Sequence, residues 1–335
     1  MKKIFMVFML FLCVKVNASI VVMDADSGRV LYSENMNEKK LIASTTKIMT
    51  SIIALENGKL DDKYIVGKEV NLVNGSMLYI KEGEEYTLND LLHGLMLKSG
   101  NDAAMVIANN VFNYEEFIAQ MNIKAFKLGM RNTSFLNPHG LNDDTSNYSS
   151  AYDLALLMKY AIKNKDFLRI TRAKKYGVGS YLWNNKNELL FSYKYLISGK
   201  IGYTKKSGPV YVSAAYKDGK TLIVVSINES DKFNLHRRLY ETYFKLYDRV
   251  NILDKNTFSY LISHKKNHYY IDNDFHMLLK EDEIKKVKVK TFLNDFYNYS
   301  EVYFDGKLIH REKVNVLEYS KRNNKIKEFL IFSRW

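Results

Sequence analysis

Apolar and polar residues recur with two different periods over the first 250 or so positions, which predicts a mixture of strands and helices. Two apolar runs, residues 20–23 and 29–32, flank an Asp-Ala-Asp-Ser-Gly segment with turn chemistry, which predicts a hairpin. A second predicted hairpin joins residues 210–215 and 222–227 through Lys-Asp-Gly-Lys. Helical spacing of apolar residues predicts helices at 48–57, 88–97, from 102 onward, 114–128 and 235–247.

The pattern changes after about residue 249. Short segments such as 287–290 and 302–304 alternate polar and apolar residues, and Asp305 and Gly306 supply a hairpin turn. We therefore predict an α+β domain at residues 19–249 and a small all-β domain at 250–320. The tail, residues 321–335, is basic and then aromatic, and it fits either an amphipathic membrane-surface segment or a final strand.

The first residues have the layout of a secretory signal peptide, which we assign to residues 1–18. Two lysines precede the apolar run 4–14, and Val-Asn-Ala at 16–18 fits a cleavage site. The run is shorter than the roughly 20 residues that a membrane-spanning helix needs. We expect cleavage after Ala18 and export of the mature chain. The alternatives are an uncleaved anchor or a lipid on Cys13, and the bulky Leu12 argues against lipidation.

Composition narrows the classes of function. An apolar fraction of 47% excludes wholesale disorder, and a single cysteine excludes both a disulfide framework and a cysteine-based metal site. His264, His268 and His276 cluster in the sequence without an H-E-x-x-H motif, so we expect neither a metal nor a cofactor. The formal charge of +13 indicates an anionic partner, and export argues against nucleic acid in that role.

Three short motifs stand in a fixed order along the predicted α+β domain. Residues 44–47 (STTK) begin a predicted helix, residues 99–101 (SGN) lie between two helices, and residues 200–202 (KIG) precede a strand pair. Each motif alone is weak, because a serine at a helix start is usually a cap and a lysine is usually solvated. Their combination and order favour a catalytic interpretation, since such motif sets belong to acyl-transferring serine enzymes.

The chemistry of the motifs supports that interpretation. Residues three apart share one face of a helix, so the Lys47 amine lies within reach of the Ser44 hydroxyl. A serine becomes a good nucleophile when a nearby base takes its proton. A lysine acts as that base only if burial or a neighbouring cation lowers its pKa, and Lys200 supplies a candidate cation. Backbone N–H groups at the helix start favour an oxyanion there.

At this point the chain resembles the serine-type D-alanyl-D-alanine carboxypeptidases, the low-molecular-mass penicillin-binding proteins. The resemblance is strong over residues 20–247 and rests on pattern alone beyond them. The segments that carry it, in the order of the family, are 43–50 (ASTTKIMT), 98–104 (KSGNDAA), 121–122 (MN), 128–130 (LGM), 137–141 (NPHGL), 153–155 (DLA), 182–185 (LWNN) and 199–204 (GKIGYT).

The resemblance assigns roles to individual residues. Ser44 is implied to be the acylated nucleophile and Lys47 its base. Ser99 is implied to relay a proton, and Asn101 to orient the substrate peptide and the lysine. Lys200 is implied to face the terminal carboxylate of the substrate.

The resemblance also implies a fold, a substrate and an oxyanion site. The expected catalytic domain is an antiparallel sheet flanked by helices, as in β-lactamases and penicillin-binding proteins. Backbone N–H groups of Ser44 and Tyr203 are implied to hold the oxyanion, with Gly202 and Thr204 beside the substrate. The implied reaction removes the terminal D-alanine from a peptidoglycan stem peptide through an acyl-enzyme, without a cofactor. β-Lactams are the implied inhibitors. Separately, the positive charge that remains on the exported chain suits anionic lipid headgroups and wall polymers as partners.

One residue departs from the family pattern. Ile201 stands where the third motif normally has threonine, and one lost hydrogen bond to a charged group costs about 1.5–3 kcal/mol. Thr204 is a substitute donor, and Lys232, Arg237 and Arg238 are candidates for the family's carboxylate-binding arginine. Two alternatives therefore stay open: a catalytically attenuated wall-binding or scaffolding protein, and a D,D-endopeptidase. A β-lactamase is disfavoured, since no glutamate that positions a deacylating water is identifiable.

Overall fold

The computed structural model describes residues 18–142, 146–258, 269–294 and 297–316, and the backbone of 329–331. Apart from Ala18, the predicted signal peptide lies outside the described residues, as does most of the tail. Among the described residues, no helix is long and apolar enough to cross a membrane.

The centre of the larger domain is an antiparallel sheet in the order β2-β1-β11-β10-β9. Both predicted hairpins are confirmed. The strands are β1 (Ser19–Asp24), β2 (Val30–Glu34), β9 (Leu196–Thr204), β10 (Gly208–Lys217) and β11 (Lys220–Ile227). Strand β9 lies at the edge of the sheet, so alternate backbone groups along it have no strand partner on that side.

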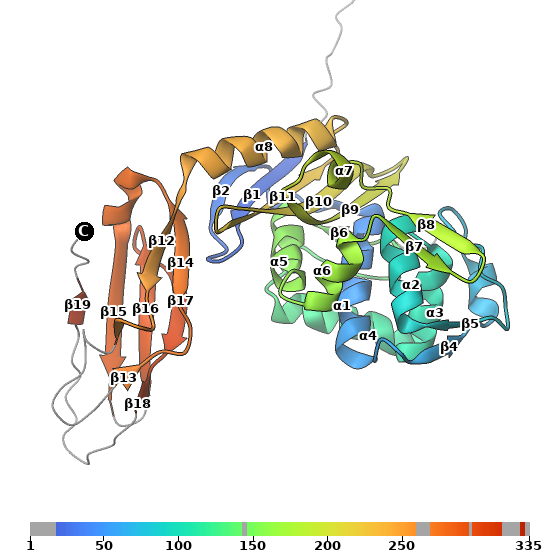
Figure 1. Ribbon diagram of the computed structural model, residues 1–335, viewed down its shortest axis with the longest axis horizontal. Coiled ribbons are helices and arrows are strands. Elements are labelled where there is room, and N and C mark those ends of the chain that lie inside the picture. Colours follow the sequence, from blue (N-terminus) through green and yellow to red (C-terminus); the bar gives the residue numbers. More distant parts are fainter. Residues whose placement is uncertain (1–17, 143–145, 259–268, 295–296, 317–328, 332–335) are drawn as a thin grey trace, which may run out of the picture.

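Helices cover both faces of this sheet (Figure 1). Helix α8 (Lys232–Leu246) packs on one face, where Val22 of β1 meets Tyr240 and Phe244. A helical layer packs on the other face, where Val21 of β1 joins the larger core cluster. That layer contains α1 (Lys47–Asn57), α2 (Leu88–His93), α3 (Asn101–Val111), α4 (Tyr114–Lys127), α5 (Ala151–Ala161) and α6 (Lys165–Arg172).

Shorter elements complete the larger domain. The predicted helix at 88–97 is present, but it continues from α2 into a π-helix, η3 (Gly94–Lys98). Small strand pairs join β3 (Lys40–Leu41) to β6 (Tyr148–Ser149), β4 (Lys63–Ile65) to β5 (Glu85–Thr87), and β7 (Lys175–Val178) to β8 (Tyr181–Asn184). The short helices are η1 (Ala43–Thr46), η2 (Lys68–Leu72) and α7 (Leu189–Ser192).

The C-terminal part is rich in strands and stands beside the larger domain (Figure 1). Alternating burial along β15 places Val289, Thr291 and Leu293 inside, as the sequence pattern predicts. Its elements are β12 (Asp248–Leu253), β13 (Tyr269–Tyr270), β14 (Phe275–Leu279), η4 (Glu281–Lys286), β15 (Val287–Leu293), β16 (Asn298–Phe304), β17 (Lys307–Lys313), β18 (Asn315–Val316) and β19 (Phe329–Ile331). Strand β19 pairs with β15, so within the tail residues 329–331 form a strand.

Candidate active site

Ser44 lies in the short helix η1, directly before α1. The preceding residue, Ala43, has a φ of +45°, a conformation that non-glycine residues rarely adopt and that concentrates at functional sites. Gly140 packs directly against it: a β-carbon added to Gly140, whose φ is +89°, would lie 2.0 Å from the Ala43 carbonyl oxygen. The loop around Gly140 therefore interlocks with the segment that presents Ser44.

Lys47 is fully buried beneath Ser44 and makes three polar contacts. Its Nζ lies 3.1 Å from Ser44 Oγ, 2.7 Å from Asn101 Oδ1 and 2.6 Å from the His139 carbonyl oxygen. Burial, followed by the positive charge of Lys200, lowers the pKa of Lys47 well below its ordinary value. This is the environment that a lysine needs to serve as a base near neutral pH.

Ser99 and Lys200 form a second pair in the same site. Lys200 Nζ donates to Ser99 Oγ at 3.0 Å and to the Ile201 carbonyl oxygen at 2.9 Å. Burial, followed by the charge of Lys186, lowers the pKa of Lys200 to about 7. Ser99 ends the π-helix with a φ of +68°, and this left-handed residue turns the chain into α3. The third motif precedes the strand pair β10–β11, as predicted, and it lies within a further strand, β9, that the sequence pattern did not predict.

Asp102 holds a loop against the start of α3. Its carboxylate accepts hydrogen bonds from the backbone N–H groups of Leu78, at 3.0 and 2.8 Å, and of Tyr79, at 2.8 Å. Its neighbour Asn101 donates to the Asn74 carbonyl oxygen through Nδ2, which fixes the amide so that Oδ1 points to Lys47. Adjacent residues of one helix thus fix a loop and the position of the Lys47 amine.

Strand β9 comes close to the backbone of Ser44 at Gly202. A β-carbon added to Gly202 would lie 3.0 Å from the Ser44 backbone nitrogen, so a larger residue would push the strand away. The Tyr203 side chain is exposed. Thr204 points elsewhere, because its hydroxyl donates to Ser207 Oγ at 2.9 Å and accepts from Asn142 Nδ2 at 2.8 Å.

A cavity of about 290 Å³ opens at these residues. It brings together four residues of the predicted site at its surface: Ser44, Ser99, Gly202 and Tyr203. The other four are not part of its lining: Lys47, Asn101, Lys200 and Thr204. Its full lining is Ser44, Ser76, Ser99, Lys186, Ile201, Gly202, Tyr203, Pro209 and Lys232.

Of the three basic candidates near the last strand, Lys232 lines this cavity. Arg237 donates to Ser192 Oγ at 2.8 Å, and Arg238 pairs with Asp231 at 3.1 Å. The sequence reasoning did not find Lys186, which also lines the cavity and lowers the pKa of Lys200. The Lys47 contact with the backbone of His139 was also missed, because a carbonyl oxygen leaves no signal in a sequence.

Within the described parts of the chain, no three His, Cys, Asp or Glu residues gather as metal ligands would. His264 and His268 lie outside the described residues.

The comparisons with known proteins agree with this geometry. A sequence profile of the D-alanyl-D-alanine carboxypeptidases, peptidase family S11, matches residues 14–231. D-alanyl-D-alanine carboxypeptidase DacF of Bacillus subtilis is 36% identical over 228 residues, covering 63% of this chain and 57% of that protein. DacC of Escherichia coli is 34% identical over 247 residues, covering 69% of this chain and 62% of that protein. The chain thus spans about three fifths of the length of these curated relatives.

Solved structures extend the likeness over both domains. Penicillin binding protein 6B of Escherichia coli is 27% identical with a TM-score of 0.70, covering 89% of this chain and 94% of that one. Penicillin binding protein 5 of Haemophilus influenzae shares the fold with a TM-score of 0.74 at 22% identity, covering 91% of this chain and 97% of that one. With the family profile matching most of the chain, this protein belongs to the D-alanyl-D-alanine carboxypeptidase family.

Proposed function

We propose that this protein is an exported serine D-alanyl-D-alanine carboxypeptidase that removes the terminal D-alanine of peptidoglycan stem peptides through a Ser44 acyl-enzyme. The observation that carries the proposal is the set of contacts around the Lys47 amine. Membership of the family and the names of its relatives support the same reaction.

A neutral lysine amine has two hydrogens and one lone pair. Two of the three partners of Lys47, Asn101 Oδ1 and the His139 carbonyl oxygen, accept hydrogen bonds and cannot donate them. When Lys47 is neutral, both of its hydrogens are therefore taken, and the lone pair is left for the hydroxyl proton of Ser44. The lowered pKa of Lys47 favours this neutral form. Lys47 is thus prepared to deprotonate Ser44 as it attacks.

In the proposed reaction, Ser44 Oγ bonds to the carbonyl carbon of the penultimate D-alanine while its proton passes to Lys47. The backbone N–H groups of Ser44 and Tyr203 hold the resulting oxyanion, which the close approach of β9 at Gly202 makes reachable. Collapse breaks the peptide bond, and the leaving amine takes a proton through Ser99. Water then hydrolyses the ester and regenerates Ser44. A β-lactam opens on the same serine.

The terminal carboxylate of the substrate needs a cationic partner. Lys200 and Lys232 are proposed for that role, since Lys232 lines the cavity and Ile201 offers no hydroxyl. An ammonium replaces part of what the missing threonine would contribute, because hydrogen bonds to charged groups are the stronger kind.

Release of D-alanine from a soluble pentapeptide tests the proposal directly. Wild type should release D-alanine and take up labelled penicillin covalently, and Ser44→Ala should do neither. Ser51→Ala is a matched control, because Ser51 lies in α1, which directly follows η1, and bonds only to a backbone carbonyl oxygen among the described residues. Equal release by wild type and Ser44→Ala would refute the acyl-enzyme.

Ile201 favours one second candidate, an attenuated protein that binds wall peptides with little turnover. In that case penicillin would label Ser44 slowly, and D-alanine release would stay near background in wild type.

A further inference from the structure

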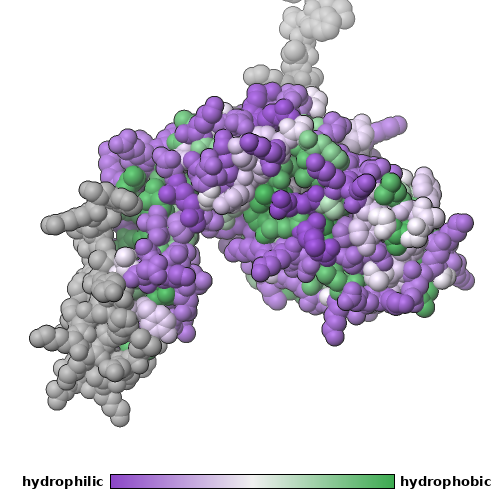
Figure 2. Space-filling model, viewed as in Figure 1, coloured by the Kyte–Doolittle hydropathy of each residue, from purple (hydrophilic) through white to green (hydrophobic). Residues whose placement is uncertain are grey.

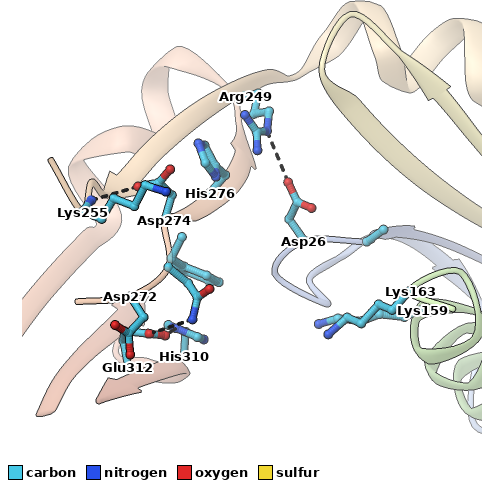
Figure 3. Close-up of a pocket in the computed structure, with 13 residues that line it drawn as sticks. Asp26, Lys159, Lys163, Arg249, Lys255, Asp272, Asp274, His276, His310 and Glu312 are labelled. Atoms are coloured by element: carbon cyan, nitrogen blue, oxygen red, sulfur yellow. Dashed lines mark hydrogen bonds and ion pairs between the residues drawn. The ribbon is translucent and has the colours of Figure 1, made fainter. Parts of the chain in front are cut away.

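A second, larger cavity lies between the two domains, away from Ser44. Its volume is about 620 Å³, within the roughly 300–1,000 Å³ typical of small-ligand sites. Figure 2 shows the surface hollowed between the domains, and Figure 3 shows charged side chains converging on the space from both sides. We call this space the interdomain cleft.

The wall of the cleft on the catalytic side is basic. Lys159 of α5 and Lys163, one helical turn further on, both point into the cleft (Figure 3). Within the described residues, neither ammonium has a hydrogen bond or an ion pair. Lys159 lies against Gly28, where an added β-carbon would be 2.7 Å from its Nζ, and burial together with Lys163 lowers its pKa. Two cations are therefore held close together without a direct ion pair in the described residues, although the charges of Asp24 and Asp26 act on Lys159 from further away.

The opposite wall, from the C-terminal domain, is acidic. Asp272, Asp274 and Glu312 line it, with Lys255 as the one lysine that this domain contributes to the cavity lining. The carboxylates are held in place by donors: Asn315 Nδ2 bonds to Asp272, the Lys255 backbone N–H to Asp274, and His310 Nε2 to Glu312.

At the closed end of the cleft, Arg249 and Asp26 pair across the domains at 3.3 Å and neutralise each other (Figure 3). The remaining charge is therefore divided, positive on one wall and negative on the other. A simple anion would be attracted by one wall and repelled by the other, and the same holds for a simple cation. A ligand that carries both charges at its two ends satisfies both walls.

We propose that the interdomain cleft binds a zwitterionic peptide, with a carboxylate against Lys159 and Lys163 and an amine against Asp272, Asp274 and Glu312. The occupant we assign is a peptidoglycan stem peptide that carries a free side-chain amine, and this assignment rests on the proposed function. Such a site engages a stem other than the one being cleaved, and so it holds the polymer beside the catalytic domain.

Isothermal titration calorimetry on full-length Ser44→Ala protein tests the proposal without turnover. The probe is N-acetyl-γ-D-glutamyl-L-lysyl-D-alanine, and a second probe carries an acetylated lysine amine. Lys163→Gln and Asp274→Asn should each weaken binding of the first probe about tenfold, as expected for the loss of one charged contact. Lys165→Gln, at an exposed lysine outside the cleft, should bind like the parent.

The acetylated probe identifies which wall holds the amine. It should bind about tenfold more weakly than the first probe, and Asp274→Asn should add no further loss, while Lys163→Gln still should. Equal affinity of all variants for the first probe would overturn the proposal, as would no binding at all. A change in domain spacing by small-angle X-ray scattering without any change in affinity would make the cleft a hinge and would likewise overturn it.

A separate measurement distinguishes failure of the cleft proposal from failure of the active-site proposal. In protein that retains Ser44, Lys163→Gln and Asp274→Asn should release D-alanine from a soluble pentapeptide at the wild-type rate, because both residues lie outside the catalytic cavity.

Discussion

Lys47 and Lys200 are both buried in one site, and their surroundings give them different tasks. Lys47 contacts two carbonyl-type oxygens and the nucleophile, which suits a neutral base. Lys200 contacts Ser99 and a backbone carbonyl oxygen near the open cavity, which suits a cation that meets a carboxylate. The positive charge of Lys200 also adds to the electrostatic cost of charging Lys47.

The lowered pKa of Lys200 predicts an alkaline loss of activity. Its positive charge is present below about pH 7 and is lost as the pH rises through that value in the free enzyme. The kcat/KM for a peptide with a free terminal carboxylate should therefore decline above neutral pH. Lys200→Arg, whose guanidinium stays charged, should move that decline upward. Stopped-flow measurement of the acylation rate across the pH range follows the decline in wild type and in Lys200→Arg. If the pH profiles of the two proteins superimpose, the alkaline decline does not arise from Lys200.

Ile201 supplies a test of a single hydroxyl group. Threonine and valine have nearly the same shape, so comparing Ile201→Thr with Ile201→Val separates hydrogen bonding from altered packing. Ile201→Thr should raise kcat/KM for D-alanine release about tenfold over Ile201→Val, the lower end of what a bond to a charged group is worth. Equal rates for the two variants would mean that Lys232 already provides the whole contact.

The sequence predicted the charged and hydroxyl-bearing residues of the site better than the residues that position them. The Ser44–Lys47 contact follows from helix periodicity, and Lys200 was expected as the cation that the structure brings to the site. The His139 carbonyl oxygen and the inward direction of Lys186 depend on how loops close, which no local pattern encodes. The absence of Thr204 from the cavity lining also depends on how loops close. Its hydroxyl bonds to Ser207, in the turn after β9, and to Asn142, in a distant loop.

Among the elements, the loop 137–141 and strand β9 both close onto η1. The loop depends on Asn137, whose Oδ1 accepts the backbone N–H of Gly140 at 2.6 Å, and on Asn147, whose Nδ2 bonds to Thr46 Oγ1 at 3.0 Å. The strand depends on Gly202, whose missing side chain lets it approach Ser44. Backbone segments far apart in the chain thus fix the position of Ser44 without any covalent cross-link.

Gly140→Ala should damage this interlock, and Gly83→Ala is its matched control. Both glycines have similar positive φ values, +89° and +86°, but an added β-carbon meets the Ala43 backbone at Gly140 and nothing within 4 Å at Gly83. Conformational strain alone should cost each variant about 1–2 kcal/mol. The clash should cost Gly140→Ala about 1–3 kcal/mol more and slow penicillin acylation. Chemical denaturation and labelling rates measure the two effects; equal losses would refute the interlock.

Periodicity predicted most of the long helices, because their faces are uniformly buried or exposed. It predicted neither the helices α5 and α6, nor the short pairs β3–β6, β4–β5 and β7–β8, nor any part of β9. Four of the five residues 198–202 of β9, all but Ile201, are small or charged, so this stretch gives no apolar alternation. The sequence pattern is therefore least informative where β9 contributes Lys200 and Gly202 to the site, as is common for functional segments.

At the scale of the whole molecule, the domains meet through the β1–β2 hairpin. Arg29 bonds to the Leu278 carbonyl oxygen at 3.0 Å, pairs with Glu283, and lies 4.1 Å from the centre of the Phe304 ring. Asp24 accepts the Leu278 backbone N–H at 3.1 Å. The hairpin thus carries the contacts that orient the C-terminal domain, in addition to completing the sheet.

Arg29→Ala should loosen the C-terminal domain far more than Arg249→Ala. Both arginines pair across the domain boundary, but Arg29 and its partner are largely buried, whereas the Arg249 pair is about one-third exposed. We expect Arg29→Ala to cost roughly 2 kcal/mol or more, and Arg249→Ala about 1 kcal/mol or less. Calorimetry and protease sensitivity near residue 248 measure the difference; identical stability of the two variants would contradict it.

The strand order has a consequence for when the proposed active site can be assembled. Ser19 of β1 pairs with Ile227 of β11, so the interior of the sheet cannot form until more than 200 residues have followed β1. Ser44 is synthesised early, whereas Lys200 and Gly202 arrive late. Contacts so distant in sequence form slowly. An incomplete chain therefore holds Ser44 without Lys200 and Gly202, and the proposed active site is assembled only as the whole domain folds.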